Sequence, residues 1–251
     1  MKLAIMQPYF FPYIGYFQLI NAVDKYILLD ELFFIKEAWI NRNCILNKSS
    51  KKTDYISVPL EKKSSNKKIC EVKIFNKFNW KRKFLNAIYL NYKGSLYFEE
   101  TYNFVERLID FSTNYISELN KNSITKICEY LQINTRISSY ETYFNEVEDL
   151  IVQDTFRESS DRKKYPVKVL RILEFCNREN ADVFYNAVGG QALYDKRLFC
   201  EHNIELGFVK TDNIIYKQFD ETFYPNLSII DVMMHNTKDD IREILNQYKI
   251  I

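Results

Sequence analysis

Two short apolar runs stand within the first thirty residues, and the segment between them constrains the fold more than any other part of the chain. The runs are Leu3–Met6 and Tyr26–Leu29, and an amphipathic helix pattern at Tyr16–Ile20 separates them. A strand, a helix and a second strand this close together predict a βαβ unit with parallel strands. In an open parallel sheet, ligands bind in the crevice at the carboxyl ends of the strands. We therefore expect the ligand site where these runs end.

Strand and helix patterns continue to alternate along the rest of the chain. Further strands are predicted at Cys44–Leu46, Tyr55–Leu60, Ile69–Phe75, Thr135–Ser139, Val183–Tyr185 and Ile204–Val209. Helices are predicted at Trp80–Tyr92, Tyr102–Phe111, Tyr115–Leu131, Pro166–Glu179, Gln191–Lys196, Ser228–His235 and Lys238–Tyr248. This order predicts an α/β fold: a Rossmann-like parallel sheet core from residues 1–43 and 133–251, with a mixed β-hairpin and helical insertion at 44–132.

Composition limits the classes of partner. A net charge of +2 and a pI near 8.1 lack the basic excess of general nucleic-acid binders, whose pI usually exceeds about 9. No apolar run approaches the roughly 18 residues of a membrane-spanning helix. Five cysteines without CxxC spacing are typical of free thiols in a reducing compartment. We predict a cytoplasmic protein without a transmembrane segment or general nucleic-acid binding, and a homodimer is compatible with the sequence.

The loop after the first strand is the first candidate site. It contains Gln7, Pro8 and Tyr9, and it leads into a helix at Gly15. Proline fixes φ and pre-shapes such a loop, and glycine lets a ligand or another backbone approach closely. The free N–H groups of the helix start could hold an anionic oxygen. Aromatic side chains that simply cover the top of the sheet are an equally good interpretation.

Polar residues after the second strand form another candidate cluster. Asp30 ends an apolar strand, where a carboxylate could act as a base. Arg42 could grip a phosphate in a bidentate manner, and Lys36 and Asn41 offer further polar contacts. Trp39 could stack on a ring. The competing interpretation is an edge hairpin with an ordinary ion pair.

The third candidate lies at the end of the strand predicted at Val183–Tyr185. Asn186 ends that strand, Gly189 and Gly190 form a turn, and Tyr194 follows. Paired glycines expose backbone amides to a ligand. A plain turn is the competing interpretation.

Basic residues gather at the start of one predicted helix. The cluster comprises Asp161–Pro166, Lys168 and Arg171. Positive charge at a helix N-terminus opposes the helix dipole, and an anionic ligand would offset that cost. A solvated helix face explains the cluster as well. No HxxxH, HExxH or Cys/His spacing predicts a metal site, and no dinucleotide or Walker motif is present.

Several motifs together resemble the WbqC-like family. They are the QPYFFPYIGYFQLI segment with the later FIK and WINRN elements, Val58–Leu60 with Lys62 and Ser64, Asn186-x-x-Gly189-Gly190-x-x-Leu193-Tyr194, and Pro225–Asp231. The resemblance spans nearly the whole chain. Members of that family are encoded among genes for O-antigen and other surface polysaccharides. The resemblance therefore implies a cytoplasmic step in making an unusual sugar.

The opening segment is also distantly similar to the nucleotidyltransferase and pantothenate-synthetase superfamily. In that superfamily, an H-x-G-H element at a helix start holds the ATP phosphates. Tyr13-Ile14-Gly15-Tyr16 would occupy its place here, with both histidines replaced by tyrosine. Asp161–Lys164 stands where a KMSKS-like element would lie. The likeness concerns the fold, and the lost histidines weigh against adenylyl transfer.

We predict a transferase that N-acylates, for example glycylates, a nucleotide-linked amino sugar, with a small acyl or amino-acid donor as second substrate. Asp30 and Lys36 are the predicted catalytic residues. Predicted substrate or nucleotide contacts are Gln7, Pro8, Tyr9, Gly15, Trp39, Asn41, Arg42, Lys62, Lys168, Asn186, Gly189, Gly190 and Tyr194. The sequence identifies no cofactor with certainty, and ATP with Mg²⁺ stays open. The alternatives are an ATP-dependent ligase or nucleotidyltransferase, which would use ATP with Mg²⁺, and a non-catalytic binding protein of a polysaccharide assembly complex.

Overall fold

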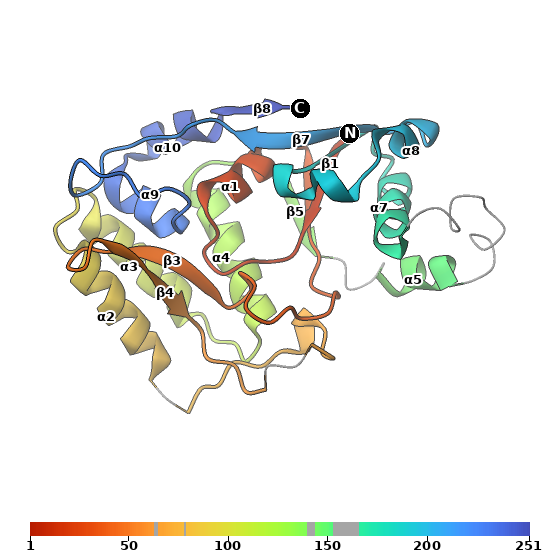
Figure 1. The fold of residues 1–251 in the computed structure, drawn as a ribbon. Coiled ribbons are helices and arrows are strands. Elements are labelled where there is room, and N and C mark those ends of the chain that lie inside the picture. The colour runs from red at the N-terminus through yellow and green to blue at the C-terminus, as the bar shows by residue number, and fades with distance from the viewer. Residues whose placement is uncertain (63–64, 78, 140–143, 153–165) are drawn as a thin grey trace.

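The computed structural model describes residues 1–62, 65–77, 79–139, 144–152 and 166–251 (Figure 1). One sheet contains β1 (Lys2–Met6), β2 (Lys25–Leu28), β5 (Arg136–Ser139), β6 (Val183–Ala187), β7 (Glu205–Thr211) and β8 (Tyr248–Ile250). The spatial order is β5-β2-β1-β6-β7-β8, and every neighbouring pair is parallel except β7 with β8. Counted along the chain, this is the doubly wound order 3-2-1-4-5-6. The predicted Rossmann-like α/β fold is therefore confirmed.

Helices cover both faces of this sheet (Figure 1). On one face lie α1 (Ile14–Asn21), α4 (Ile116–Tyr130), α9 (Ile229–His235) and α10 (Lys238–Leu245). On the other face lie α5 (Phe144–Val152), α7 (Val167–Arg178) and α8 (Lys196–Glu201). No helix in the described part of the chain is long and apolar enough to cross a membrane.

The central strands are apolar on both sides because both faces are buried. Leu3 and Ile5 of β1 pack against the α7 side, and Ala4 between them packs against the α1 side. Side chains of successive strand residues point to opposite faces, so a strand buried on both sides reads as a continuous apolar run. This is why the sequence predicted these strands correctly.

The segment from 44 to 132 forms most of the crossover from β2 to β5. It contains α2 (Trp80–Tyr92), α3 (Phe98–Asp110), α4 and a 3-10 helix, η1 (Ile69–Glu71). An antiparallel ribbon of β3 (Arg42–Asn47) and β4 (Lys52–Ser57) precedes them. Its apolar side chains share one continuous core with the α1 side of the sheet. The domain division at residues 44 and 132 stays a prediction.

The strand predicted at Ile69–Phe75 is wrong. The segment begins with η1, and Lys73 and Ile74 form only isolated bridges. Ile69 and Val72 are both buried, which a strand could not achieve on one face because its side-chain period is two. A spacing of three matches a 3-10 turn instead.

Two further differences concern the C-terminal part. A 3-10 helix, η2 (Val188–Leu193), replaces the glycine turn, and the next helix begins at Lys196 rather than Gln191. The helix predicted to run to Tyr248 ends at Leu245, and β8 follows as an antiparallel edge strand. Three residues at a sheet edge carry too short a pattern to be recognised.

Candidate functional site

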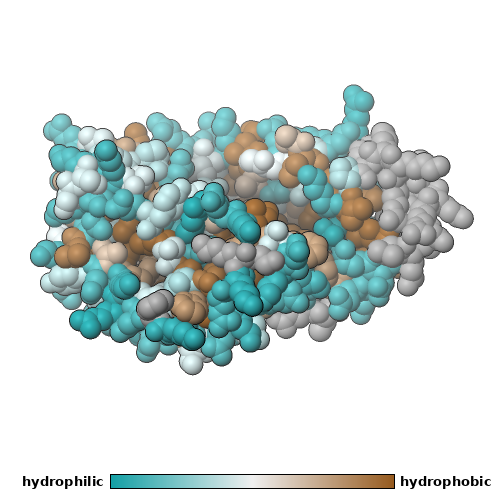
Figure 2. All heavy atoms as spheres, turned by 60° about the horizontal axis from the view of Figure 1, so that its bottom comes forward, coloured by the Kyte–Doolittle hydropathy of each residue, from teal (hydrophilic) through white to brown (hydrophobic). Residues whose placement is uncertain are grey.

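A cavity of about 530 Å³ lies at the carboxyl ends of the central strands. The chain leaves β1 toward β2 on one side, while β6 and β7 lie on the other, so the strand order reverses between β1 and β6. Ligands of open α/β sheets bind at such a reversal. Figure 2 brings this face forward and shows apolar side chains in a depression surrounded by hydrophilic ones. The lining includes eight predicted site residues: Gln7, Tyr9, Trp39, Lys168, Asn186, Gly189, Gly190 and Tyr194.

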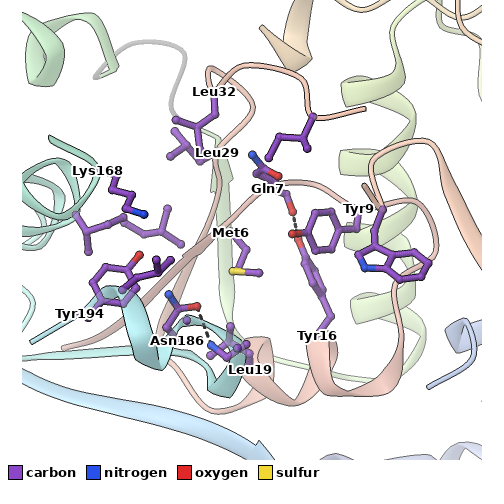
Figure 3. A pocket seen from close by; sticks show the side chains of 18 of the residues that line it. Met6, Gln7, Tyr9, Tyr16, Leu19, Leu29, Leu32, Lys168, Asn186 and Tyr194 are labelled. Carbon is purple, nitrogen blue, oxygen red and sulfur yellow. Dashed lines mark hydrogen bonds between the residues drawn. The ribbon is translucent and has the colours of Figure 1, made fainter. Parts of the chain in front are cut away.

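The loop of residues 7–13, hereafter the aromatic loop, forms one wall of the cavity. Its backbone is held by buried side chains. The Asn120 amide donates to the carbonyl oxygens of Pro8 (2.9 Å) and Ile40 (2.8 Å). The Tyr16 hydroxyl donates to the Gln7 carbonyl at 2.9 Å (Figure 3). These bonds tie the loop to α4 and α1.

Two more buried side chains hold the middle of the aromatic loop. The Asn43 amide donates to the carbonyls of Phe10 (3.0 Å) and Phe11 (2.8 Å), and the Ser228 hydroxyl also donates to Phe11, at 2.8 Å. Phe11 is fully buried and has a φ of +40°. That backbone conformation is strained for any residue other than glycine. Such a conformation persists only where the surrounding structure enforces it. The loop is thus rigidly preformed.

Gly15 acts on the cavity through Tyr13. A Cβ atom at position 15 would collide with the Tyr13 ring and would lie 2.8 Å from the Thr211 hydroxyl oxygen. Gly15 itself does not line the cavity. The glycine therefore makes room for an aromatic side chain of the wall rather than for a ligand.

Among the described residues, four phenols line the cavity. Burial raises the pKa of Tyr9, Tyr13, Tyr16 and Tyr194 above 10.0, and the neighbouring Tyr13 raises that of Tyr9 further. These side chains stay neutral at physiological pH and can donate hydrogen bonds. Tyr9 and Tyr16 stand across the cavity from Tyr194, with Met6 between them (Figure 3).

Asn186 and the two glycines form the opposite side. Asn186 is buried, and its side-chain oxygen accepts from the backbone N–H of Ala187 at 2.7 Å (Figure 3). A Cβ atom on Gly190 would lie 2.9 Å from the Asn186 amide nitrogen, whereas one on Gly189 would meet nothing within 4 Å. Gly190 is therefore needed to seat the Asn186 side chain, and Gly189 leaves the cavity open.

Two cations lie one helical turn apart on α7. Arg171 is engaged by Glu148 through two nitrogens, one of them at 2.9 Å. Lys168 is exposed, and among the described residues it has no ion-pair partner. Figure 3 shows its side chain reaching toward the space beside Tyr194. Within the described part of the chain, Lys168 is thus the cavity cation that remains available to a ligand.

The predicted catalytic residues lie elsewhere. Asp30 is buried with one carboxylate oxygen 2.7 Å from the Lys121 ammonium, and the same oxygen accepts from the Ser117 hydroxyl. Both partners belong to α4, outside the cavity. Lys36 is exposed and does not line the cavity either. A catalytic role for Asp30 and Lys36 finds no support in this geometry and stays a prediction.

Four other predicted contacts also fall outside the cavity. Pro8 is buried, and Asn41 donates to the Val58 carbonyl at 2.9 Å. Arg42 lies 4.6 Å from the Tyr55 ring centroid and donates to the Glu37 carbonyl. Lys62 is exposed. Of the residues predicted to contact a ligand or to catalyse, Gln7 and Gly190 thus line the cavity, whereas Asp30 and Arg42 do not. The proposed KMSKS-like segment at 161–164 lies outside the described residues.

Sequence reasoning missed the apolar floor of the site. Met6, Leu29 and Ile172 line the cavity, and nothing distinguishes such residues from ordinary core. Arg171 was noticed only as part of a basic cluster. The lining contains no carboxylate, histidine or cysteine among the described residues, and those residues hold no cluster suited to a metal. The site can therefore stack rings, donate hydrogen bonds and neutralise negative charge.

The chain is similar to known proteins over nearly its whole length. The model of the WbqC-like protein family matches residues 7–243. Uncharacterized protein Rv1507c of Mycobacterium tuberculosis (strain ATCC 25618 / H37Rv) is 27% identical over 237 residues, covering 93% of each chain. No solved structure matches the chain.

Proposed function

The chain belongs to the WbqC-like protein family, and we propose that it is a cytoplasmic transferase that N-acylates a nucleotide-linked amino sugar during surface-polysaccharide biosynthesis. The small acyl group is an aminoacyl group such as glycyl or a similar unit. The observation that carries this proposal is the combination in one cavity, at the strand-order reversal, of aromatic rings, amides and a lysine that pairs with none of the described residues.

Each part of a nucleotide-linked sugar has a suitable counterpart in the cavity. Tyr9, Trp39 and Tyr194 offer ring faces for a base or a sugar, since such rings stack favourably on flat apolar surfaces. Lys168 offers a positive charge for the diphosphate. Gln7 and Asn186 offer amides that can recognise the heteroatoms of a base or the hydroxyls of a sugar.

The chemical step transfers an acyl group from an activated donor. The sugar amine attacks the acyl carbon, a C–N bond forms, and the bond to the leaving group breaks. The amine proton passes to solvent or to the leaving group. The neutral phenols of Tyr9 and Tyr13 are suited to donate hydrogen bonds to the oxyanion, because such donors in a water-poor site lower the barrier. The backbone N–H groups near Gly189 and Gly190 stay candidates for the same task.

The absence of a carboxylate from the described lining favours a donor that is already activated. A free amine attacks a thioester or an aminoacyl ester without a strong base, so oxyanion stabilisation is the main requirement. This consideration favours acyl transfer over a ligase that must activate a carboxylate with ATP.

Binding and turnover test the proposal separately. The purified chain is titrated with nucleoside diphosphates and their amino-sugar conjugates by calorimetry, with Lys168→Ala and the exposed ribbon variant Lys52→Ala compared. We expect Lys168→Ala to weaken binding of the conjugates about tenfold, the worth of one charge-assisted contact, and Lys52→Ala to leave it unchanged. Equal affinities of both variants and wild type would contradict the assignment of the cavity.

Turnover is followed by mass spectrometry of the sugar after addition of aminoacyl and acyl thioester donors. An acylated sugar supports the transferase. Release of AMP or pyrophosphate with ATP and Mg²⁺ would instead favour the ligase or nucleotidyltransferase. Tight binding without any product over this panel would favour a binding protein of an assembly complex.

A further inference from the structure

A smaller hollow of about 240 Å³ adjoins the main cavity, and we call it the side hollow. Tyr9, Tyr13 and Trp39 line both spaces. Pro12, Asn43 and Asn226 complete the side hollow. The three shared aromatic side chains form a wall that a single extended ligand would contact from both sides.

The exposure of Trp39 is unusual for so large an apolar side chain. It is 41% exposed, whereas Trp80, the other tryptophan of the chain, is 6% exposed. Tyr55 lies close to parallel to Trp39, at 30° and 6.4 Å between centroids, and Arg42 lies 4.6 Å from the Tyr55 centroid. Trp39 is therefore supported from behind while much of it faces solvent. Exposed, supported aromatic rings are suited to stack on a ligand.

Only one of the two amides of the side hollow is free to bind. Asn43 uses both its donors and its acceptor within the protein, in bonds to Phe10, Phe11 and the N–H of Cys44. Asn226 is exposed, and the structure shows no hydrogen bond of its side chain to any described residue. Asn226 can therefore accept from and donate to the hydroxyls of a ligand.

We propose that the side hollow binds the pyranose ring of the substrate, while the main cavity holds the nucleoside diphosphate. This inference rests on the proposed function and adds the orientation of the substrate to it. A pyranose presents apolar C–H faces and polar hydroxyls, which match the aromatic wall and Asn226. The larger cavity contains Lys168, and the larger, charged part of the substrate belongs there. The sugar amine then lies beside the phenols of Tyr9 and Tyr13, where acyl transfer takes place.

The backbone of Asn226 dictates how its side chain can be removed. Its φ is +58°, a left-handed conformation that alanine adopts only with strain and glycine adopts freely. Asn226→Gly therefore deletes the amide without backbone strain. Asn203 has the same φ of +58° and lies between α8 and β7, outside both spaces. Asn203→Gly is thus a matched control.

Trp39 fluorescence reports occupancy, because Trp80 is buried and the variant Trp39→Phe identifies the responding residue. Methyl glucosaminide is titrated into the full chain at millimolar concentrations, without any nucleotide. We expect a saturable emission change that Trp39→Phe abolishes. Asn226→Gly should weaken it about tenfold, as expected for loss of one or two hydrogen bonds, whereas Asn203→Gly and Lys168→Ala should leave it within twofold of wild type.

The outcomes separate this inference from the proposed function. No saturable response to the glycoside, or equal affinities for Asn226→Gly and Asn203→Gly, overturns the sugar site. The response to the glycoside can depend on Asn226 while an attached nucleoside diphosphate gives no gain in affinity. That result supports the sugar site and contradicts a nucleotide-linked sugar as the substrate. A gain in affinity that Lys168→Ala abolishes supports both.

Discussion

Truncation of Asn43 should expose how strongly the aromatic loop is held. The side chain is 3% exposed and makes three hydrogen bonds of 2.8–3.0 Å, to the Phe10 and Phe11 carbonyls and from the Cys44 N–H. In Asn43→Ala, Phe11 keeps its bond from the Ser228 hydroxyl. The Phe10 carbonyl and the Cys44 N–H lose the bonds that Asn43 supplied.

The expected cost follows from those two groups. A buried polar group left without a partner costs about 1–3 kcal/mol, and Cys44 is only partly buried, so water can reach its N–H. We expect the free energy of unfolding to fall by roughly 3 kcal/mol. For a chain of this length, about 2–4 °C of melting temperature is lost per kcal/mol, which gives a shift of about 6–12 °C.

Urea and thermal unfolding followed by circular dichroism measure the change. Asn21→Ala is the control, because Asn21 makes one exposed side-chain bond of 3.2 Å to Asn246, and its loss should cost less than about 0.5 kcal/mol. The strained φ of Phe11 should relax in Asn43→Ala, so ligand binding should weaken as well. If Asn43→Ala were as stable as Asn21→Ala, the account of a side-chain-held loop would be refuted.

Three further outcomes are expected. Gly190→Ala should displace the Asn186 amide and weaken ligand binding about tenfold, roughly one hydrogen bond, whereas Gly189→Ala should not; calorimetry that finds the two alike would contradict the packing described. Burial raises the pKa of Tyr16, Tyr26 and Tyr92 well above 10.0. As the pH rises, these phenols therefore stay protonated in the folded state at pH values where the same phenols of the unfolded chain already lose their protons. Their contribution to stability should hold below about pH 10 and decline above it, and urea midpoints that stay constant from about pH 8 to pH 11 would speak against it. Asp30→Asn should lower the free energy of unfolding by about 2 kcal/mol, because it weakens hydrogen bonding to a charged group, and should change ligand affinity little. Loss of turnover at unchanged stability would return Asp30 to the catalytic role that its position in the sequence first indicated.

The central parallel strands could be predicted because they are buried on both faces. Leu3–Met6 and Tyr26–Leu29 read as unbroken apolar runs, and Pro166 marks the start of α7. The edge strand β8 could not be predicted. It has three residues and pairs with β7 alone, so its side chains do not have to follow a recognisable apolar pattern. The turn at η1 was hidden because Val72 and Ile74 alternate as in a strand, whereas the spacing of three between Ile69 and Val72 matches a 3-10 turn.

The candidate site was predicted in its location more accurately than in its members. Strand ends identify the edge of the sheet, but not the direction of each side chain beyond it. Leu29 lines the cavity, and Asp30, the next residue, faces α4 and its Lys121, as the alternation of successive side chains requires. The register of that alternation depends on which helix covers which face, and a single sequence does not show this.

The aromatic loop receives its shape from residues that are synthesised long after it. Asn120 lies 112 positions beyond its partner Pro8, and Ser228 lies 217 positions beyond Phe11. During translation, which proceeds from the N-terminus, the strained loop conformation cannot be secured until Ser228 has left the ribosome. Contacts of such sequence separation also form slowly. The ability to bind ligand should therefore arise late in folding. Chains truncated before Ser228 should lack it even where the sheet has formed.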